Sequence, residues 1–250
     1  MAMSTREWTP SSCIEQIRAR RPKRCIATRQ SRVELRPRGH AAVLVALFSD
    51  EAGVLRVVLT QRSLSLKSHP GEIAFPGGKL DHGENVREAA FRECHEEIGL
   101  DMHAHIEDGR AEVLAVLDPV LSKHLLSVTP VVVYLKDVRA LSDLNISLSQ
   151  DEVSACFTAP IDLFLKDDGY DCQDVELLGY DVRVHGWMYS ARDAVAEGSS
   201  VDSGYRIWGL TAWIMIDIAM LATRVSPAFA LRSDGGLSLG DFVPEWTEST

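Results

Sequence analysis

The chain has 250 residues, of which 46% are hydrophobic and 25% charged, the composition of a globular protein with a core. Its formal net charge of −10 disfavours a general nucleic-acid-binding role, including the removal of RNA caps. No apolar run is long enough to cross a membrane. The longest candidate, residues 207–222, is interrupted by Asp217 and predicts a packed helix instead.

The first segment, residues 1–38, is basic, with ten Lys and Arg residues against three Glu. We expect it to form a helix and loop that belong to the fold. The alternative is a mitochondrial targeting peptide, which is also rich in Arg and poor in acids. Five cysteines at irregular spacing predict reduced thiols in an intracellular protein, most simply a cytoplasmic one. The C-terminal residues, Trp-Thr-Glu-Ser-Thr, are not a peroxisomal signal of the Ser-Lys-Leu kind.

The first elements after this segment are strands. The continuous apolar run 40–48 predicts a buried strand, and residues 53–62 follow after a turn-like stretch, so the two predict a hairpin. Residues 72–75 predict a short third strand that ends at Pro76-Gly77-Gly78. Residues 85–99 turn to a helical pattern, with Gly99 as the C-terminal stop. Residues 111–120 and 128–136 predict two more strands.

The remaining chain continues the alternation. We expect a strand edge at 151–156, a short helix at 159–165, strands within 171–190, a loop at 191–204 and a buried helix over 205–225. Strands before and after a helix, with another helix closing the chain, predict layered mixed α/β architecture. We find no interdomain linker, and we predict one domain over residues 39–225 followed by a C-terminal tail, residues 226–250.

Three glutamates of the first helix carry the clearest chemistry. Glu93, Glu96 and Glu97 stand at i, i+3 and i+4, so they share one helix face, opposite an apolar stripe. Carboxylates this close repel one another unless cations bind them, and hard oxygen ligands favour Mg²⁺ or Mn²⁺. The plainer interpretation is a solvated acidic helix face, which does not account for the glycines that flank the helix.

The flanking residues complete a spaced pattern, G-x5-E-x7-R-E-U-x-E-E-x-G-U, in which U is a bulky apolar residue. The matching positions are Gly78, Glu84, Arg92, Glu93, Glu96, Glu97 and Gly99, with Cys94 at the first U position. This stretch resembles the Nudix box of the Nudix hydrolases. The resemblance implies an α/β/α sandwich around a mixed sheet and metal-dependent cleavage of a diphosphate that is linked to another group.

The same resemblance implies roles for individual residues. Glu93, Glu96 and Glu97 would be the metal ligands, joined by the backbone carbonyl of Gly78. Arg92 and Glu84 would hold these carboxylates in place. The metal would neutralise the diphosphate and activate a water, and a glutamate would accept its proton. Glu96, Glu97 and, from outside the pattern, Glu152 remain alternatives for this general base.

The residues before the box bear on the substrate. Val58 to Gly78 resemble the coenzyme A diphosphatase signature L-L-T-x-R-[SA]-x3-R-x3-G-x3-F-P-G-G, with Lys67 where an arginine is usual. The resemblance implies hydrolysis of coenzyme A or acyl-coenzyme A to 3′,5′-ADP and (acyl-)4′-phosphopantetheine. We predict substrate contacts at Arg62, Lys67, His69 and Gly77.

Two alternatives differ in function. One is a Nudix diphosphatase for ADP-ribose, NADH or an oxidised nucleoside triphosphate, and the other is a catalytically silent binding module. We expect a small-molecule substrate, with neither a nucleic acid nor a membrane as partner. The sequence does not discriminate a monomer from a homodimer.

Overall fold

The computed structural model describes residues 8–20, 33–196 and 204–244. Most of the basic charge of segment 1–38, Cys25 and the middle of the expected loop 191–204 lie outside these ranges. In the described part, no helix is long and apolar enough to span a bilayer, and the four described cysteines are free.

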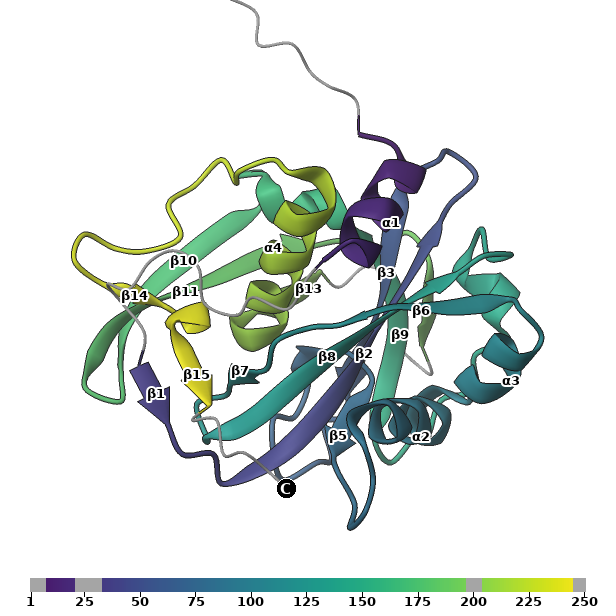
Figure 1. Cartoon of the computed structure of the whole chain (residues 1–250), viewed down its shortest axis with the longest axis horizontal. Helices are drawn as coiled ribbons and strands as arrows, with labels where there is room; N and C mark the ends of the chain where they lie inside the picture. The colour runs from purple at the N-terminus through teal and green to yellow at the C-terminus, as the bar shows by residue number, and fades with distance from the viewer. Residues whose placement is uncertain (1–7, 21–32, 197–203, 245–250) are drawn as a thin grey trace, which may run out of the picture.

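A nine-stranded mixed sheet forms the centre of the molecule (Figure 1). Its main path runs β12-β9-β3-β2-β8-β6, in the order Ala194–Ala196, Val153–Pro160, Leu55–Arg62, Gly39–Ser49, Leu126–Leu135 and Ala111–Val116. Three short strands pair beside it, β4 (Ile73–Ala74), β5 (Gly77–Lys79) and β7 (Val120–Leu121). The sheet is mixed because β2 pairs antiparallel with β3 and parallel with β8, and the predicted hairpin of β2 and β3 is confirmed.

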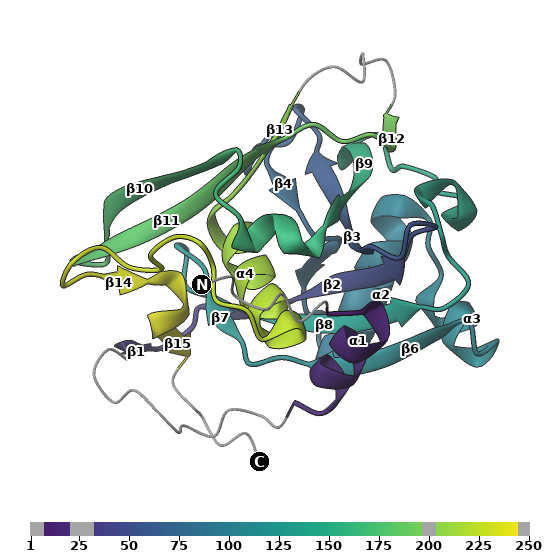
Figure 2. The same ribbon diagram turned by 90° about the horizontal axis from the view of Figure 1, so that it is seen from above.

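Helices cover both faces of this sheet (Figures 1 and 2). Helices α1 (Pro10–Arg18) and α4 (Gly209–Thr223) pack on one face, and α2 (Val86–Ile98) and α3 (Met102–Glu107) on the other. Strand β2 alternates between the two cores, with Val45 and Leu47 in the first and Leu44 and Ala46 in the second. Burial on both faces explains its continuous apolar run. The predicted α/β/α sandwich is therefore confirmed.

A second sheet of four strands lies beside α4. Its strands are β10 (Tyr170–Leu177), β11 (Tyr180–Tyr189), β13 (Tyr205–Trp208) and β14 (Leu237–Ser238). Near it, β1 (Val33–Leu35) pairs in parallel with β15 (Phe242–Pro244). Three 3₁₀ turns complete the chain, η1 (Leu141–Leu144), η2 (Ile161–Leu165) and η3 (Leu239–Asp241). The described residues on both sides of the domain predicted at 39–225 thus pack on it, while the boundaries themselves stay predictions.

The structure differs from the sequence-based expectations at several element ends. The last helix begins at Gly209 and not at Tyr205, because Tyr205 and Ile207 are buried and Arg206 exposed, a period-two pattern that pairs with β11. The helix expected at 159–165 is a 3₁₀ turn, since β9 continues to Pro160. The glycines expected to form a turn extend instead as β5, and α3 was not predicted.

Candidate active site

Helix α2 begins and ends where its sequence provides caps. The Asn85 side chain accepts hydrogen bonds from the backbone N–H groups of Arg87 (2.9 Å) and Glu88 (3.1 Å), and Glu88 accepts one from the Asn85 N–H in return. At the other end Gly99 adopts the left-handed conformation, with a φ of 73°, and closes the last turn on His95. These caps fix the helix that carries the box glutamates.

The three glutamates of α2 differ in burial. Glu97 is 5% exposed, whereas the side chains of Glu93 and Glu96 are 18% and 52% exposed. Each residue advances the helix by about 100°, which places Glu97 nearest to the buried Cys94, Glu93 next and Glu96 farthest around. The three glutamates predicted to share one helix face therefore differ in solvent exposure, which rises from Glu97 through Glu93 to Glu96.

Arg92 contacts both Glu93 and the more exposed Glu96. Its Nε and Nη2 donate to the two carboxylate oxygens of Glu84 (2.8 and 3.1 Å), and its Nη1 donates to Glu93 and Glu96 (both 3.0 Å). Nη2 also donates to the Lys79 carbonyl at 3.1 Å. The hydrogen bonds from Arg92 hold the pKa of Glu84 below its usual range. Arg92 thus positions two of the predicted ligands, in the geometry expected of a supporting residue.

Glu97 is a buried acid whose Oε2 atom has no hydrogen-bond partner. Burial, reinforced by the neighbouring Glu93 carboxylate, raises the pKa of Glu97 to about 8, and Arg62 opposes this shift only in part. Burial likewise raises the pKa of Glu93 against the opposing effect of Arg92. Two carboxyl groups that repel in a buried place are stabilised as anions when a cation binds between them.

Gly78 lies directly against Glu93, because a Cβ at Gly78 would overlap that carboxylate. Its neighbour Gly77 also has no room for a side chain, since a Cβ there would overlap the Ala42 carbonyl of β2. Strand β5 therefore runs directly against the Glu93 carboxylate only because both positions are glycine.

These features fit a divalent cation. In the described residues, no group of three His, Cys, Asp or Glu side chains forms a ready-made metal site. The unpartnered oxygen of Glu97, the adjoining Glu93 and the close approach of Gly78 nevertheless supply hard oxygen donors, and Arg92 holds Glu96 on the solvent side. Glu93, Glu96, Glu97 and the Gly78 carbonyl are the residues that would hold the ion.

The predicted substrate residues do not all meet at one place. Arg62 ends β3, and its Nε is buried without a hydrogen-bond partner. His69 lies on the next loop, where its Nδ1 is 2.6 Å from Glu72 Oε2. Lys67 is exposed on the same loop and does not line the cavity described below. Glu152 is exposed at the start of β9, and its charge adds to the raised pKa of both Glu93 and Glu97, so it lies near them.

A cavity of about 410 Å³ opens beside these residues. Its lining includes Arg62, His69, Gly77, Gly78 and Lys79 from β3, the following loop and β5, and mostly apolar residues from the second sheet.

Two further lining residues, Lys123 and His124, come from the turn between β7 and β8 and were not predicted. The His124 ring meets the His69 ring edge-on, with centroids 5.4 Å apart. No local pattern could indicate this contact, because it joins residues far apart in the chain.

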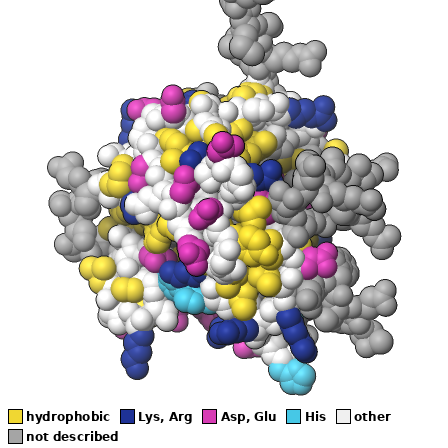
Figure 3. All heavy atoms as spheres, turned by 90° about the vertical axis from the view of Figure 1, so that its left-hand side faces the viewer, with side chains coloured by type: hydrophobic (Ala, Val, Ile, Leu, Met, Phe, Trp, Pro, Cys, Tyr) yellow, Lys and Arg dark blue, Asp and Glu magenta, His cyan; other side chains and the backbone are white. Residues whose placement is uncertain are grey.

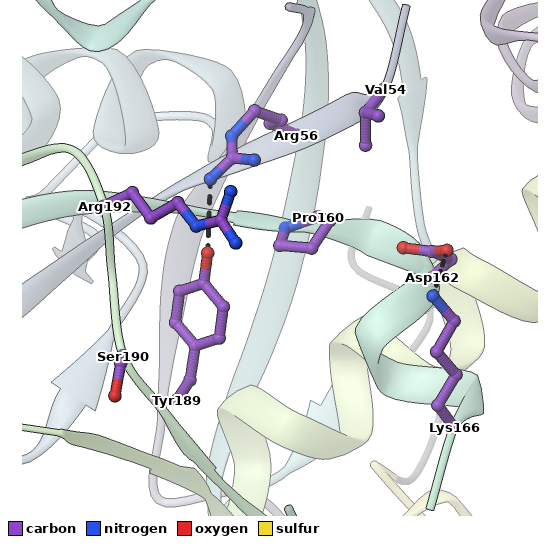
Figure 4. A pocket seen from close by; sticks show the side chains of 8 residues that line it. All are labelled: Val54, Arg56, Pro160, Asp162, Lys166, Tyr189, Ser190 and Arg192. Atoms are coloured by element: carbon purple, nitrogen blue, oxygen red, sulfur yellow. Dashed lines mark hydrogen bonds and ion pairs between the residues drawn. The ribbon is translucent and has the colours of Figure 1, made fainter. Parts of the chain in front are cut away.

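A second hollow, about 390 Å³ in volume, lies near Arg56, Tyr189 and Arg192 (Figure 4). The Arg56 guanidinium is held by hydrogen bonds within the protein, because its Nε donates to Thr158 Oγ1 at 2.7 Å and its Nη2 donates to Tyr189 Oη at 3.2 Å. The guanidinium ties β3 to β9 and β11. This hollow is a structural junction, and none of Arg62, Gly77 and Gly78 is part of its lining.

The NUDIX domain model matches residues 38–176. Nudix hydrolase 22, chloroplastic, of Arabidopsis thaliana is 40% identical over 79% of this chain and 59% of its own length. Peroxisomal coenzyme A diphosphatase NUDT7 of Mus musculus is 31% identical over 94% of this chain and 89% of its own.

Among solved structures, the Nudix hydrolase RenU of M. smegmatis aligns with a TM-score of 0.39 and 21% identity, over 51% of this chain and 74% of that one. The chain spans about three fifths of the length of the first curated relatives it matches. With the family model matching more than half of the residues and the box folded as a capped helix beside a glycine strand, the chain belongs to the Nudix family.

Proposed function

We propose that this protein is a metal-dependent hydrolase that cleaves the diphosphate of coenzyme A and its thioesters to 3′,5′-ADP and 4′-phosphopantetheine or its acyl form. The observation that carries the proposal is the meeting of two sequence motifs at one cavity. Arg62 from the upstream signature lines the cavity beside Gly78 of the box, and its charge acts on the buried Glu97. A diphosphate at this place meets the Arg62 cation and lies beside Gly78, which adjoins the Glu93 carboxylate.

The residues of the site have three different roles in this proposal, namely metal binding, positioning and charge stabilisation. Glu93, Glu96 and Glu97 would hold Mg²⁺ or Mn²⁺ with the Gly78 carbonyl, and the ion would supply positive charge and lower the pKa of a bound water. Arg92, fixed by both oxygens of Glu84, keeps Glu93 and Glu96 in place. Arg62 directs its guanidinium charge toward the diphosphate, where it stabilises negative charge that develops on the bridging oxygen.

The proton acceptor is one of three carboxylates. Glu97 is buried beside the site, Glu96 is exposed on its solvent side, and Glu152 approaches from β9. We propose Glu97 as a metal ligand and Glu152 as the base, because Glu152 is near both Glu93 and Glu97 yet exposed to the water that must lose its proton. Exchange of Glu152 for Gln then lowers kcat without lowering metal affinity. A loss of metal affinity in that variant would reject the assignment.

Coenzyme A is favoured over other diphosphates on two grounds. The residues from Val58 to Gly78 match the subfamily signature at all but two positions, and a relative matched along most of both chains is named as a coenzyme A diphosphatase. Lys67 is exposed outside the cavity lining, so we assign cation contact at the diphosphate to Arg62, with His69 and Lys123 as further donors.

A substrate panel tests the proposal. The purified protein is incubated with Mg²⁺ or Mn²⁺ and with coenzyme A, acetyl-coenzyme A, ADP-ribose, NADH or 8-oxo-dGTP, and products are resolved by chromatography. Release of 3′,5′-ADP at the highest kcat/KM supports the proposal. Faster cleavage of ADP-ribose or NADH would assign another Nudix substrate, and metal binding without turnover of any compound would make the protein a binding module.

We also propose an intracellular location, cytoplasmic or mitochondrial. The free thiols of Cys13, Cys94, Cys156 and Cys172 suit a reducing compartment. Mass spectrometry of the N-terminus of the protein isolated from cells distinguishes the two, because a cleaved basic segment is expected only after import. An oxidised, disulfide-linked form isolated from cells would contradict both locations.

A further inference from the structure

The cavity that begins at Gly78 continues to the second sheet, where its walls are apolar. We call this part the apolar chamber and define it by six residues, Leu121, Val175, Val184, Trp208, Ile214 and Leu239. They come from six different elements, namely β7, β10, β11, β13, α4 and η3. A cavity of about 410 Å³ lies within the range of small-molecule sites, roughly 300–1,000 Å³.

Strand register explains why one wall of the chamber is apolar. In the β10–β11 hairpin Gln173 pairs with Val184 and Val175 with Val182, so these side chains share a face with Leu177. Trp208 of β13 joins the same face, because it pairs with Gly186 two residues beyond Val184.

The opposite face of the hairpin is already occupied by other contacts. Asp174 and Arg183 form an ion pair there at 2.7 Å, and His185 lies against the Leu231 carbonyl at 3.3 Å. The hairpin is therefore a partition with an apolar inner surface. Figures 1 and 2 show it standing beside α4.

Charge is distributed unequally along the cavity. Its charged and histidine lining residues come from the end of β3, the following loop, β5 and the turn between β7 and β8, and they are Arg62, His69, Glu72, Lys79, Lys123 and His124. The lining residues from β10, β11, β13, α4 and η3 carry no charge. The side of the molecule with β10 and β11 shows hydrophobic side chains gathered near its centre, with Lys, Arg and His below them (Figure 3). A 3′-phosphoadenosine group needs cations for its phosphate, while an acyl chain needs only apolar walls.

We infer that the apolar chamber holds the acylated end of the pantetheine arm, so that the preferred substrates are coenzyme A thioesters and not free coenzyme A. This inference rests on the proposed function. It goes beyond it by naming the half of the substrate that enters the cavity and the residues that select it. The diphosphate lies at the Gly78 end, and the thioester points to β10, β11 and η3.

The inference predicts a dependence on acyl length. Each methylene that enters the chamber raises kcat/KM by up to about fourfold, until the chamber is full, and longer chains then bind no better. We expect kcat/KM to rise from free coenzyme A through acetyl- and butyryl- to octanoyl-coenzyme A. A flat series would overturn the inference while leaving the proposed function intact.

Two neighbouring residues of β10 provide a matched pair of variants. Val175 lines the cavity, whereas Glu176 lies on the other face of the same strand and is exposed. Val175→Trp narrows the chamber and lowers the kcat/KM ratio of octanoyl- to free coenzyme A by about tenfold. Glu176→Trp adds the same bulk outside and leaves the ratio unchanged. Equal ratios in both variants would overturn the inference.

A binding measurement removes the dependence on turnover. Octanoyl-pantetheine, which has no diphosphate, is titrated by calorimetry into the wild type and into Val175→Asp, which places a charge beside the chain. We expect binding to the wild type and at least tenfold weaker binding to the variant. If Val175→Asp weakens the binding of 3′,5′-ADP and leaves the binding of octanoyl-pantetheine unchanged, the chamber belongs to the nucleotide half of the substrate and the inference is overturned.

The two hypotheses fail separately in these experiments. If no coenzyme A species releases 3′,5′-ADP, the proposed function is rejected, and octanoyl-pantetheine binding still decides whether the chamber accepts the arm. If all species react equally and octanoyl-pantetheine does not bind, the chamber inference alone is rejected. Thermal unfolding of each variant checks that Val175, which is 37% exposed, is replaced without loss of the fold.

Discussion

The two ends of the cavity are built in opposite ways. The charged end takes most of its lining from residues 62–79, namely the end of β3, the following loop and the glycine strand β5. It adjoins helix α2 through Gly78 and Glu93, and the side chains of α2 hold one another by hydrogen bonds. The apolar end is made from six elements between β7 and η3, and no hydrogen bond links the defining side chains. The charged end is thus built from polar residues that are close together in the sequence, whereas the apolar end is built from apolar residues that are far apart in the sequence.

This difference suits the charged end to the cleavage reaction and the apolar end to the choice of substrate. Charged groups work only at set distances, so the charged end needs neighbouring residues on a capped helix and an arginine that fixes them. Apolar contacts are non-directional, so the chamber tolerates exchange of similar side chains. Changes at the charged end are therefore expected to affect turnover, and changes at the apolar end to affect substrate preference or stability.

The largest effect is expected at Glu97. Glu97→Gln removes a charged metal ligand and lowers kcat by about 10²–10⁴-fold. Because the Glu97 carboxylate is buried with an unpartnered oxygen, the variant unfolds in chelator at the same temperature as the wild type or higher. Steady-state kinetics and thermal unfolding check both parts. Glu51→Gln, at an exposed turn, is the control, and near-wild-type turnover in Glu97→Gln would remove Glu97 from the site.

Behind the chamber wall, His185 gives a pH dependence of stability. Burial lowers the pKa of His185 to about 4 from an unfolded value near 6.5, and the hydrogen bond from its Nε2–H to the Leu231 carbonyl opposes this shift only in part. In this tautomer Tyr170 Oη donates to the Nδ1 atom of His185.

Because the pKa of His185 is higher in the unfolded state, the unfolded state binds a proton at a higher pH than the folded state does. His185 stabilises the fold fully above pH 6.5, and this contribution, about 3 kcal/mol, is lost as the pH falls from 6.5 to 4. Denaturant unfolding across this range checks it, with His185→Gln as the comparison. If the variant loses stability as steeply as the wild type, another group titrates.

An intermediate effect is expected at Arg92. Arg92→Lys keeps the charge but loses the fork that spans Glu84, Glu93 and Glu96, so metal affinity falls by about 10–100-fold. Titration of Mn²⁺ followed by electron paramagnetic resonance measures the loss. Arg18→Lys, which breaks a comparable two-bond contact to Glu112 far from α2, serves as the control. Unchanged Mn²⁺ affinity would show that Glu84 and Arg92 stabilise only the fold.

The smallest effect is expected at Arg62. Arg62→Gln removes one charge-assisted contact to the diphosphate and lowers kcat/KM by about tenfold for every coenzyme A species alike. The acyl-length dependence is retained, because Arg62 lies at the charged end. Arg87→Gln on the exposed side of α2 is the matched control. A change in acyl preference with Arg62→Gln would break the division between the two ends.

The charged end could be predicted from sequence because its information is local. Fixed spacing on one helix defines which carboxylates share a face, and Asn85 and Gly99 mark where that helix begins and ends. The unequal burial of Glu93, Glu96 and Glu97 could not be predicted, since it depends on how α2 rotates against the sheet. Lys67 stands at a signature position where arginine is usual, and it is exposed outside the cavity lining, on the loop after β3.

The fold class followed from alternating strands and helices, but the apolar end did not. Tyr205 to Trp208 are aromatic and aliphatic, so they continued the helical pattern of α4 in the sequence, and only pairing with β11 makes them a strand. Leu239 lies in a segment that matched no predicted element, yet it lines the chamber. Contacts between residues so distant in the chain leave no local periodicity to detect.

The pairing of β1 with β15 and of β14 with β11 has a consequence for synthesis on the ribosome. Strands β2 and β8 and helix α2 can associate once about half of the chain has emerged, because all three precede residue 136. The chamber must wait until residues 237–244 leave the exit tunnel, so its apolar walls stay open to water and to chaperones after α2 and the central strands have associated. The nascent chain therefore assembles its carboxylate cluster before its apolar chamber.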